Sequence, residues 1–222
     1  MKGKVINLSC KEAWEFLSTR HYAGRKPPIS EAFGWEIDGE LVAVCTFGKP
    51  ASPSLCRGIC GDQYSEYVYE LNRLCRVEGL KEPISQFVSA CLRRLRVHNW
   101  IIVSYSDTAM HHNGYIYQAC NFLYTGQTKQ RTDKYTEGGK HSRHYNNDEQ
   151  GRFRIVRSAK NRYVYFATMD KKTKRKYMDA LNYPILPYPK EQNQNYVLGT
   201  FIKPVLVPCE PKIKEKIEVP LA

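Results

Sequence analysis

The stretch from Ile101 to Gly126 constrains the fold more than any other part of this 222-residue chain. It opens with a short apolar run, Ile101-Ile102-Val103, whose polar borders are typical of a buried strand. Next comes the polar segment Ser104-Tyr105-Ser106-Asp107. An Asn113-Gly114 turn then precedes apolar residues at helical spacing, from Tyr115 to Phe122. A strand therefore delivers polar groups to its carboxyl end, which is the edge at which open α/β sheets bind ligands.

Other patterns predict the elements around this strand. A capping box formed by Ser9 and Glu12 begins a helix. The further expected elements are two antiparallel strands at 32–36 and 41–47, a loop at 49–61, a central strand at 67–77, a helix at 84–97, a strand at 162–166 and a helix within 171–181. Strict alternation along the central strand would place Glu70 and Asn72 on one face, and Leu71 and Arg73 on the other. The sum is an α+β or α/β chain with a mixed central sheet flanked by helices.

The positive charge is concentrated in one segment. Residues 127–190 hold 16 of the 34 Lys and Arg residues but only 6 of the 22 Asp and Glu residues, which accounts for ten of the twelve net charges. Cations interleaved with aromatic rings can neutralise phosphates and stack on unpaired bases, so this segment predicts nucleic-acid binding. The cations expected to make these contacts are Lys129, Arg131, Lys134, Arg143, Arg152, Arg154, Arg157, Lys160 and Arg162.

The same charge distribution suggests how the chain is organised. We expect a catalytic core over residues 1–126, then a basic, aromatic-rich extension over 127–190 that completes the fold and contacts nucleic acid. Residues 191–222 are expected to form an extended tail.

Composition excludes several classes of protein. No run of about 18 apolar residues is present, so we expect no membrane span, and the charged N-terminal segment does not read as a signal peptide. The eight cysteines are therefore expected to be mostly reduced and buried, and Cys56 and Cys60 make only a weak zinc signal. The expected location is the cytoplasm of a bacterial host cell.

Five residues are candidates for chemistry near the strand end. Asp107, beside Ser104, has the placement of a general base, although a carboxylate there can also cap the next segment. The phenol of Tyr117 could donate a proton or stack on a base, or it could be a core tyrosine. Arg73 lies in an otherwise apolar strand and needs a partner, which could be Glu70, Asp107 or a bound phosphate or carboxylate. Ser85 begins a helix whose positive end could hold an anion.

Histidines supply a further set of candidates. His21 and Tyr22 lie in a loop rich in donors, and His111 and His112 follow the strand, so imidazoles surround the expected cleft and suit base chemistry or metal ligation.

These motifs resemble a known family. Gly114, Tyr117 and Phe122 fit the G-x-x-Y-x-x-x-x-F helix of the GNAT N-acyltransferase fold. Together with the strings FLSTRHYAGRKP, SLCRGICG and YELNRLCR, the 101–126 stretch is similar to the phage Mom family of DNA-modification proteins, over most of residues 12–190.

The resemblance implies a GNAT-like fold and a transferase that converts adenine in phage DNA to N6-(carbamoylmethyl)adenine, which protects the DNA from host restriction. It places the family's arginine, aspartate and tyrosine on Arg73, Asp107 and Tyr117. From its place on the same strand as Asp107, we add Ser104 to the expected catalytic set. It also places a pair associated with iron on His21 and Tyr22.

One segment departs from the acyltransferase pattern. The loop expected to hold a pyrophosphate, RVEGLKEPISQ from Arg76 to Gln86, has one glycine and a proline that removes a donor, so it is a poor cradle. Arg76 and Ser85 are the residues expected to bind a cofactor there. The donor stays open between a glycine-derived group, including one carried on tRNA, and an acyl-CoA.

The expected partner is double-stranded DNA, and the sequence leaves open a charged tRNA as a second partner and a homodimer as the assembly. Two other functions stay open. The chain could be an acyl-CoA-dependent N-acyltransferase acting on a small amine, or a nucleic-acid-binding protein without catalytic activity that reuses the same fold.

Overall fold

The computed structural model of the chain describes residues 2–135, 153–190 and 205–208. The chain divides into two compact units. The first consists of residues 1–129 and 159–200, and the second of residues 130–158 and 201–222. The segment 127–190 is thus shared between the two units, because its later part returns to the first.

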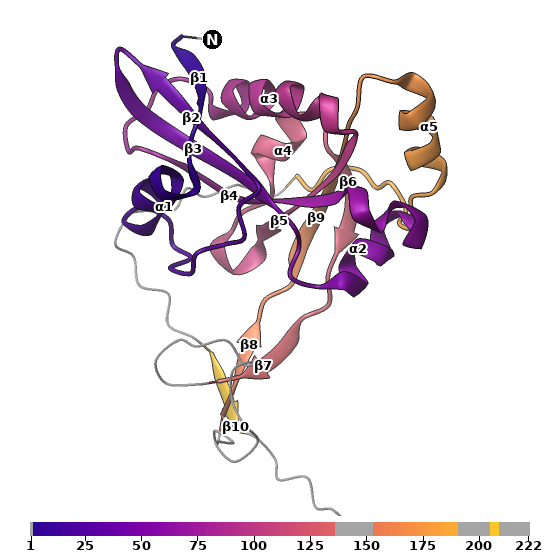
Figure 1. Cartoon of the computed structure of the whole chain (residues 1–222). Helices are drawn as coiled ribbons and strands as arrows, with labels where there is room; N and C mark the ends of the chain where they lie inside the picture. The colour runs from indigo at the N-terminus through magenta and orange to yellow at the C-terminus, as the bar shows by residue number, and fades with distance from the viewer. Residues whose placement is uncertain (1, 136–152, 191–204, 209–222) are drawn as a thin grey trace, which may run out of the picture. The chain divides into compact units, whose positions relative to one another are not determined.

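A seven-stranded sheet forms the centre of the first unit (Figure 1). Its spatial order is β1-β2-β3-β4-β5-β9-β6. The strands are β1 (Lys4–Asn7), β2 (Glu31–Ile37), β3 (Glu40–Gly48), β4 (Val68–Arg76), β5 (Trp100–Asp107), β6 (Leu123–Gln127) and β9 (Lys160–Ala167). All neighbours are antiparallel except β4 and β5, which are parallel. The predicted mixed sheet is confirmed.

Helices cover both faces of this sheet. They are α1 (Cys10–Ser18), α2 (Pro53–Cys60), α3 (Ile84–Leu95), α4 (Tyr115–Ala119) and α5 (Lys171–Asp179). One apolar cluster joins α3 to alternate residues of β2, β3 and β5, including Trp35, Phe47 and Ile102. The intervening residues pack on the opposite face, against α1 or against α2 and α5. Three short 3-10 turns, Asp62–Tyr67, Arg96–His98 and Thr108–Met110, complete the unit.

Local sequence explains where the helices begin. The capping box predicted at α1 is present: Ser9 accepts from the N–H of Glu12, and the Glu12 carboxylate accepts from the N–H of Ser9 at 2.7 Å. The expectation of a loop over residues 49–61 is wrong. Ser52 caps α2, Pro53 opens it, and Gly61 ends it with a φ of 86°. Three small apolar residues at helical spacing on α2 are buried, namely Cys56, Ile59 and Cys60.

The strand β4 contains an irregularity that turns its side chains. Thr46 of β3 lies opposite Arg73, but the next residue, Phe47, lies opposite Leu71, so Asn72 is extra. The strict alternation expected for this strand is therefore wrong beyond Leu71. Leu71 packs in the α3 cluster, while Cys75 packs against the α1 cluster.

The parallel pair β4 and β5 parts near its middle. Only three rungs join the two strands, and the last is Glu70 opposite Val103. Beyond it β4 continues along β3, while β5 continues along β9 as far as the rung between Asp107 and Lys160. The two carboxyl ends thus carry polar side chains at one edge of the sheet beyond the last rung of the ladder that joins the two strands.

The second unit is a three-stranded antiparallel sheet in the order β10-β8-β7. Its strands are β7 (Arg131–Lys134), β8 (Phe153–Arg157) and β10 (Leu206–Pro208). Arg131 lies opposite Arg157, and Asp133 pairs with the Arg157 guanidinium at 3.0 Å. This small sheet therefore carries several of the cations of the basic segment.

Two expectations from composition can be checked in the described part of the chain. No helix there is long and apolar enough to cross a bilayer. The seven cysteines described are all free, as expected, and five of them are buried.

Candidate active site

A buried hydrogen bond marks the point where β4 and β5 part. Ser104 has no exposed surface, and its hydroxyl donates to the Leu71 carbonyl at 3.0 Å. The Tyr117 hydroxyl acts on the same serine side chain, and burial raises the pKa of Tyr117 well above its ordinary value. Two predicted residues, Ser104 and Tyr117, thus lie near one another at the opening between the strands.

Packing around α4 holds the Tyr117 ring in place. The ring lies 5.4 Å from that of Phe122 and 5.3 Å from that of Tyr163, measured between centroids. Tyr163 is fully buried, and its hydroxyl donates to the Asn113 carbonyl. Gly114, with a φ of 82°, lets the backbone approach this ring, because a Cβ at Gly114 would lie 2.3 Å from Tyr163 Cε2. Tyr117 is therefore both a packed residue and part of the site.

Arg73 reaches the same edge from the other strand. Its guanidinium donates to the carbonyls of Asn72 and Arg25 at 2.7 and 2.9 Å. Its Nε is buried with no hydrogen-bond partner, and no carboxylate of the described residues lies within ion-pair distance of it. Burial lowers the pKa of Arg73. A half-buried cation that is only partly satisfied is suited to hold an anionic or carbonyl group.

The loop after α1 brings His21 and Tyr22 to this arginine. Their rings stack with centroids 4.5 Å apart, and the edge of Tyr22 faces His112 at 6.2 Å. Burial, and then the positive charge of Arg73, lower the pKa of His21 to about 4, so its imidazole is neutral at pH 7. Burial and the charge of Asp107 raise the pKa of Tyr22.

The implied iron does not fit this arrangement. His21 Nδ1 accepts from the N–H of Ala23 at 3.0 Å, which engages one of its two nitrogens, and the charge of Arg73 acts on the imidazole. Across the described residues, no three or more histidine, cysteine or carboxylate side chains are grouped to hold a metal ion. We therefore derive no chemical step through a metal.

Asp107 stands at the end of β5, where it caps the following segment and its role as a base stays a prediction. Its Oδ1 accepts from the N–H of Ala109 at 3.0 Å, which caps the following turn, and its Oδ2 lies 3.4 Å from the Lys160 ammonium. Its charge also acts on Tyr22 and His112. Burial nevertheless lowers the pKa of His112, because the carboxylate offsets the burial only in part.

Glu70 is a carboxylate of this site that the sequence indicated only as a possible partner of Arg73. It lies at the last rung before the strands part. Burial raises its pKa, while Lys160 and Arg73 oppose the rise. A carboxyl group with a raised pKa is a stronger proton acceptor than an ordinary glutamate and is suited to proton transfer. The signal in the sequence was a charged residue in the middle of an apolar strand.

A second polar atom is unsatisfied beside this cluster. The hydroxyl of Ser106 is buried and, like Arg73 Nε, has no hydrogen-bond partner. Such atoms are uncommon in folded proteins and concentrate where function requires them. The cluster therefore contains two hydrogen-bonding groups, Arg73 Nε and the Ser106 hydroxyl, that its own residues do not satisfy.

The residues predicted to bind a cofactor lie where β4 leads into α3. Arg76 donates to the Leu80 carbonyl at 3.1 Å, so part of its guanidinium holds its own loop. Pro83 precedes α3 without a side-chain cap, and the Ser85 carbonyl accepts from the Cys120 thiol. These contacts are structural, and they leave the two residues as predictions for donor binding.

The predicted nucleic-acid residues fall into three groups. The first group, Arg131, Lys134, Arg154 and Arg157, belongs to the strands of the second unit. The second group belongs to the first unit: Lys129 ends its first segment, and Lys160 and Arg162 are in β9. Arg162 donates to the oxygens of Thr125 and lies 3.3 Å over the Tyr183 ring, so it supports the first unit. Arg143 and Arg152 lie outside the described residues.

Comparison with known proteins gives one family match. The model of the Mom protein family matches residues 3–190. No curated protein sequence matches the chain.

Among solved structures, the chain is similar to several acetyltransferases. An N-acetyltransferase from Staphylococcus aureus Mu50 shares 11% identity with a TM-score of 0.47, and the match covers 76% of this chain and 100% of that one. A Bacillus subtilis acetyltransferase in complex with CoA shares 15% with a TM-score of 0.44, over 74% and 99%. A putative acetyltransferase from Salmonella typhimurium with acetyl-CoA shares 9% with a TM-score of 0.46, over 76% and 95%.

Proposed function

The chain belongs to the Mom protein family, and from that premise we propose that it is a transferase that attaches a carbamoylmethyl group to the N6 amino group of adenine in DNA. Such a modification would hide recognition sites from host restriction enzymes. The observation that supports the proposal most is the polar cluster at the parting of β4 and β5. There Arg73, Glu70, Asp107 and Tyr117 come together from two strands and a helix.

The chemistry asks for two functions that this cluster can supply. A bond forms between N6 and the transferred carbon while an N6–H bond breaks, so a base must accept one proton. The donor's leaving group keeps the electron pair of its broken bond and needs a proton or a positive neighbour. Removing a positioned general acid or base lowers rates by about 10²- to 10⁴-fold.

The direction of its pKa shift makes Glu70 a better candidate for the base than Asp107. Its raised pKa makes it a stronger proton acceptor than an ordinary glutamate, whereas the Asp107 carboxylate already caps a turn and pairs with Lys160. We assign Asp107 to orienting the amine, with Lys160 paired to it at 3.4 Å. A double-stranded substrate must release the adenine from the stack before it can reach these groups.

Tyr117 and Arg73 act on the donor side. The high pKa of Tyr117 keeps its phenol protonated, so it can donate to the leaving group, and Ser104 orients the hydroxyl. Arg73 holds a carbonyl or anionic part of the donor through the face that its backbone contacts leave free. The mass added to the adenine would identify the group that the donor transfers.

The test is mass spectrometry of nucleosides from plasmid DNA of cells that express the chain. We expect a deoxyadenosine with the added mass of a carbamoylmethyl group, and we expect Asp107→Asn and Tyr117→Phe to reduce it at least 100-fold. The matched control is Asp38→Asn, which removes an exposed carboxylate paired with Lys2 at 3.0 Å far from the cluster in sequence. It should leave the yield unchanged.

The same measurement separates the other two functions. Unmodified DNA from folded protein that binds CoA tightly in calorimetry would favour an acyl-CoA-dependent enzyme acting on a small amine. Unmodified DNA together with tight, salt-sensitive DNA binding would favour a binding protein without catalytic activity. Full modification by both folded variants would refute the roles given to Asp107 and Tyr117.

A further inference from the structure

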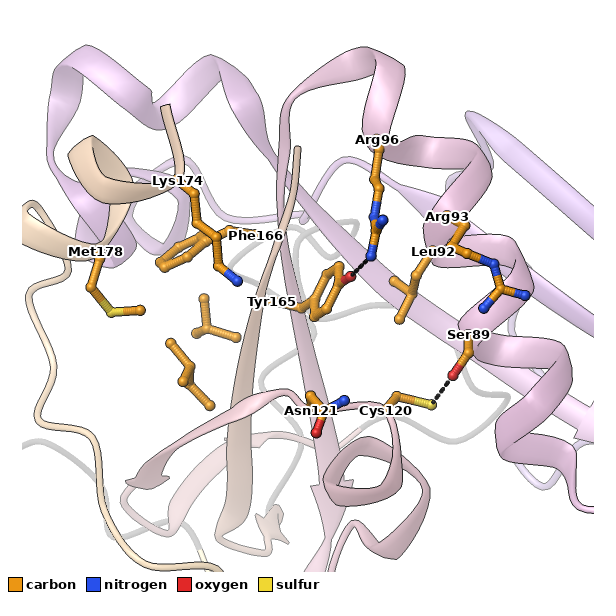
Figure 2. Close-up of a pocket in the computed structure, with 12 residues that line it drawn as sticks. Ser89, Leu92, Arg93, Arg96, Cys120, Asn121, Tyr165, Phe166, Lys174 and Met178 are labelled. Atoms are coloured by element: carbon orange, nitrogen blue, oxygen red, sulfur yellow. Dashed lines mark hydrogen bonds between the residues drawn. The ribbon is translucent and has the colours of Figure 1, made fainter. Parts of the chain in front are cut away.

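A pocket opens where the edge of β9 loses its strand partner. The first rung between β6 and β9 joins Leu123 to Val164, so Tyr165 and the residues after it are not covered by β6. The pocket there has a volume of about 300 Å³ and is bounded by α3 on one side and α5 on the other (Figure 2). It lies within the first unit.

The lining of this pocket is positively charged. It includes Arg93 and Arg96 from α3 and its end, and Lys174 from α5, but no carboxylate. Figure 2 shows these side chains approaching from two helices that lie far apart in the sequence. In the described part of the chain, no aspartate or glutamate lies within ion-pair distance of any of the three. Three cations sharing one pocket without a counter-charge favour an anionic ligand.

Of these cations, Arg96 is held in place by a hydrogen bond, whereas Arg93 has no structural role among the described contacts. Arg96 Nη2 donates to the Tyr165 hydroxyl at 3.2 Å. Arg94, the neighbour of Arg93 on α3, supports the fold by donating to the Val5 carbonyl at 2.6 Å and to Asn7. Arg93 itself is exposed and is one of the residues that line the pocket (Figure 2). The cations of the pocket are thus distinct from the one that braces β1.

The surroundings of the pocket indicate which anion it would take. Helix α5 reads KKTKRKYMD, with five cations in nine residues. Its carboxylates are already used, since Asp170 caps the helix and Asp179 lies 3.9 Å from Arg175. The positive surface therefore extends beyond the pocket, which suits a polyanion better than a single small anion.

From these observations we propose that this pocket binds a backbone phosphate of a nucleic acid, as an anchoring site separate from the reacting base. Tyr165 lies opposite Ile102 on β5, five residues before Asp107, so the pocket is roughly 17 Å along the strand from the catalytic cluster. That span corresponds to about five nucleotides of duplex DNA. This deepens the proposed function, on which the choice of DNA as the ligand rests.

The test measures binding of a fluorescein-labelled DNA duplex by anisotropy over a series of salt concentrations, using the full chain. The variant is Arg93→Gln with Lys174→Gln. The matched control is Lys172→Gln with Lys176→Gln, which removes the same charge from exposed positions of α5 that do not line the pocket. All four side chains are exposed, so the variants should fold, and circular dichroism checks this.

We expect the pocket variant to bind about tenfold more weakly. The slope of log affinity against log salt should become shallower by about 0.9, since the variant loses the one phosphate contact of the pocket. The control should change both quantities by less than half as much. An equal effect of the two variants would show that DNA binding depends on overall charge rather than on the pocket. No effect of the pocket variant would show that DNA does not bind there. Either result overturns the proposal.

Two further readouts separate this proposal from the proposed function and from another ligand. Binding needs no donor, so the anisotropy result stands even if the chain leaves adenine unmodified. If it does modify adenine, the pocket variant should yield the same modified nucleoside in smaller amount. Displacement of the DNA by adenosine monophosphate, at constant ionic strength, would assign the pocket to a free nucleotide and overturn the proposal.

Discussion

Replacing Gly114 with alanine tests the packing that holds Tyr117. The added Cβ would lie 2.3 Å from Tyr163 Cε2 and 2.5 Å from Cζ. The Tyr163 ring cannot retreat easily, because it is fully buried and lies 5.3 Å from both the Tyr117 and the Tyr124 rings. The substitution therefore forces the packing apart as well as straining the backbone.

The two contributions can be separated. An alanine at a φ of 82° costs about 1 to 2 kcal/mol, and overpacking a core site costs about 1 to 3 kcal/mol, so we expect Gly114→Ala to lower the free energy of unfolding by about 2 to 5 kcal/mol. Gly39 has a φ of 87°, and a Cβ added there would meet nothing within 4 Å. Gly39→Ala should therefore lose only the backbone contribution.

The assay is urea unfolding of the wild type, the two glycine variants and a double variant. In a Tyr163→Leu background the smaller side chain makes room, so Gly114→Ala should lose about 1 to 3 kcal/mol less than it does in the wild type. Gly39→Ala should cost the same in both backgrounds. Equal losses for the two glycine variants, or no coupling between positions 114 and 163, would refute the reasoning.

Three further changes test the site. Ser104→Ala leaves the Leu71 carbonyl without its buried donor and should lower the free energy of unfolding by about 1 to 3 kcal/mol in urea titrations; an unchanged midpoint would contradict this. The pKa of His21 is about 4 when folded and 6.5 when unfolded, so its contribution to stability is full above pH 6.5 and is lost as the pH falls toward 4. Between pH 7 and pH 5 this loss is about 2 kcal/mol, and a His21→Gln variant, compared in the same titrations, should not show it. If Glu70 is the base, the modification rate measured with purified components should fall on the acid side of a pKa above 4.5, and Glu70→Gln should abolish that limb; a limb that survives in the variant would exclude Glu70.

The part of the candidate site that strand topology alone brings together could be predicted from the sequence. Asp107 and Arg73 sit near the carboxyl ends of parallel strands, and such ends meet at one edge of a sheet. The resemblance added His21 and Tyr22, whose approach depends on a loop that no periodicity describes. That loop is held by contacts such as the one from Arg73 to the Arg25 carbonyl.

Other features depend on register, which a single sequence does not reveal. Lys160 meets Asp107 only because β9 pairs with β5 in one particular alignment across more than fifty residues of chain. The bulge at Asn72 is likewise a product of pairing with β3, and it turns Arg73 away from the alternation expected. The helix α2 was missed because serine, proline and glycine suggest a loop, although here they cap, open and end a helix.

The place of β9 in the sheet has a consequence for how the protein is made. β5 is complete at Asp107, but its second neighbour begins only at Lys160. At ribosomal speeds of about 5 to 20 residues per second, β5 spends roughly 3 to 10 seconds as an open edge, with Ile101, Ile102 and Val103 already synthesised. β6 emerges in that interval with no partner, since its ladder is also with β9. The nascent chain is thus most prone to aggregation late in translation, and a chain that stops before residue 160 carries one open edge of β5 and an unpaired β6, which only its missing part could cover.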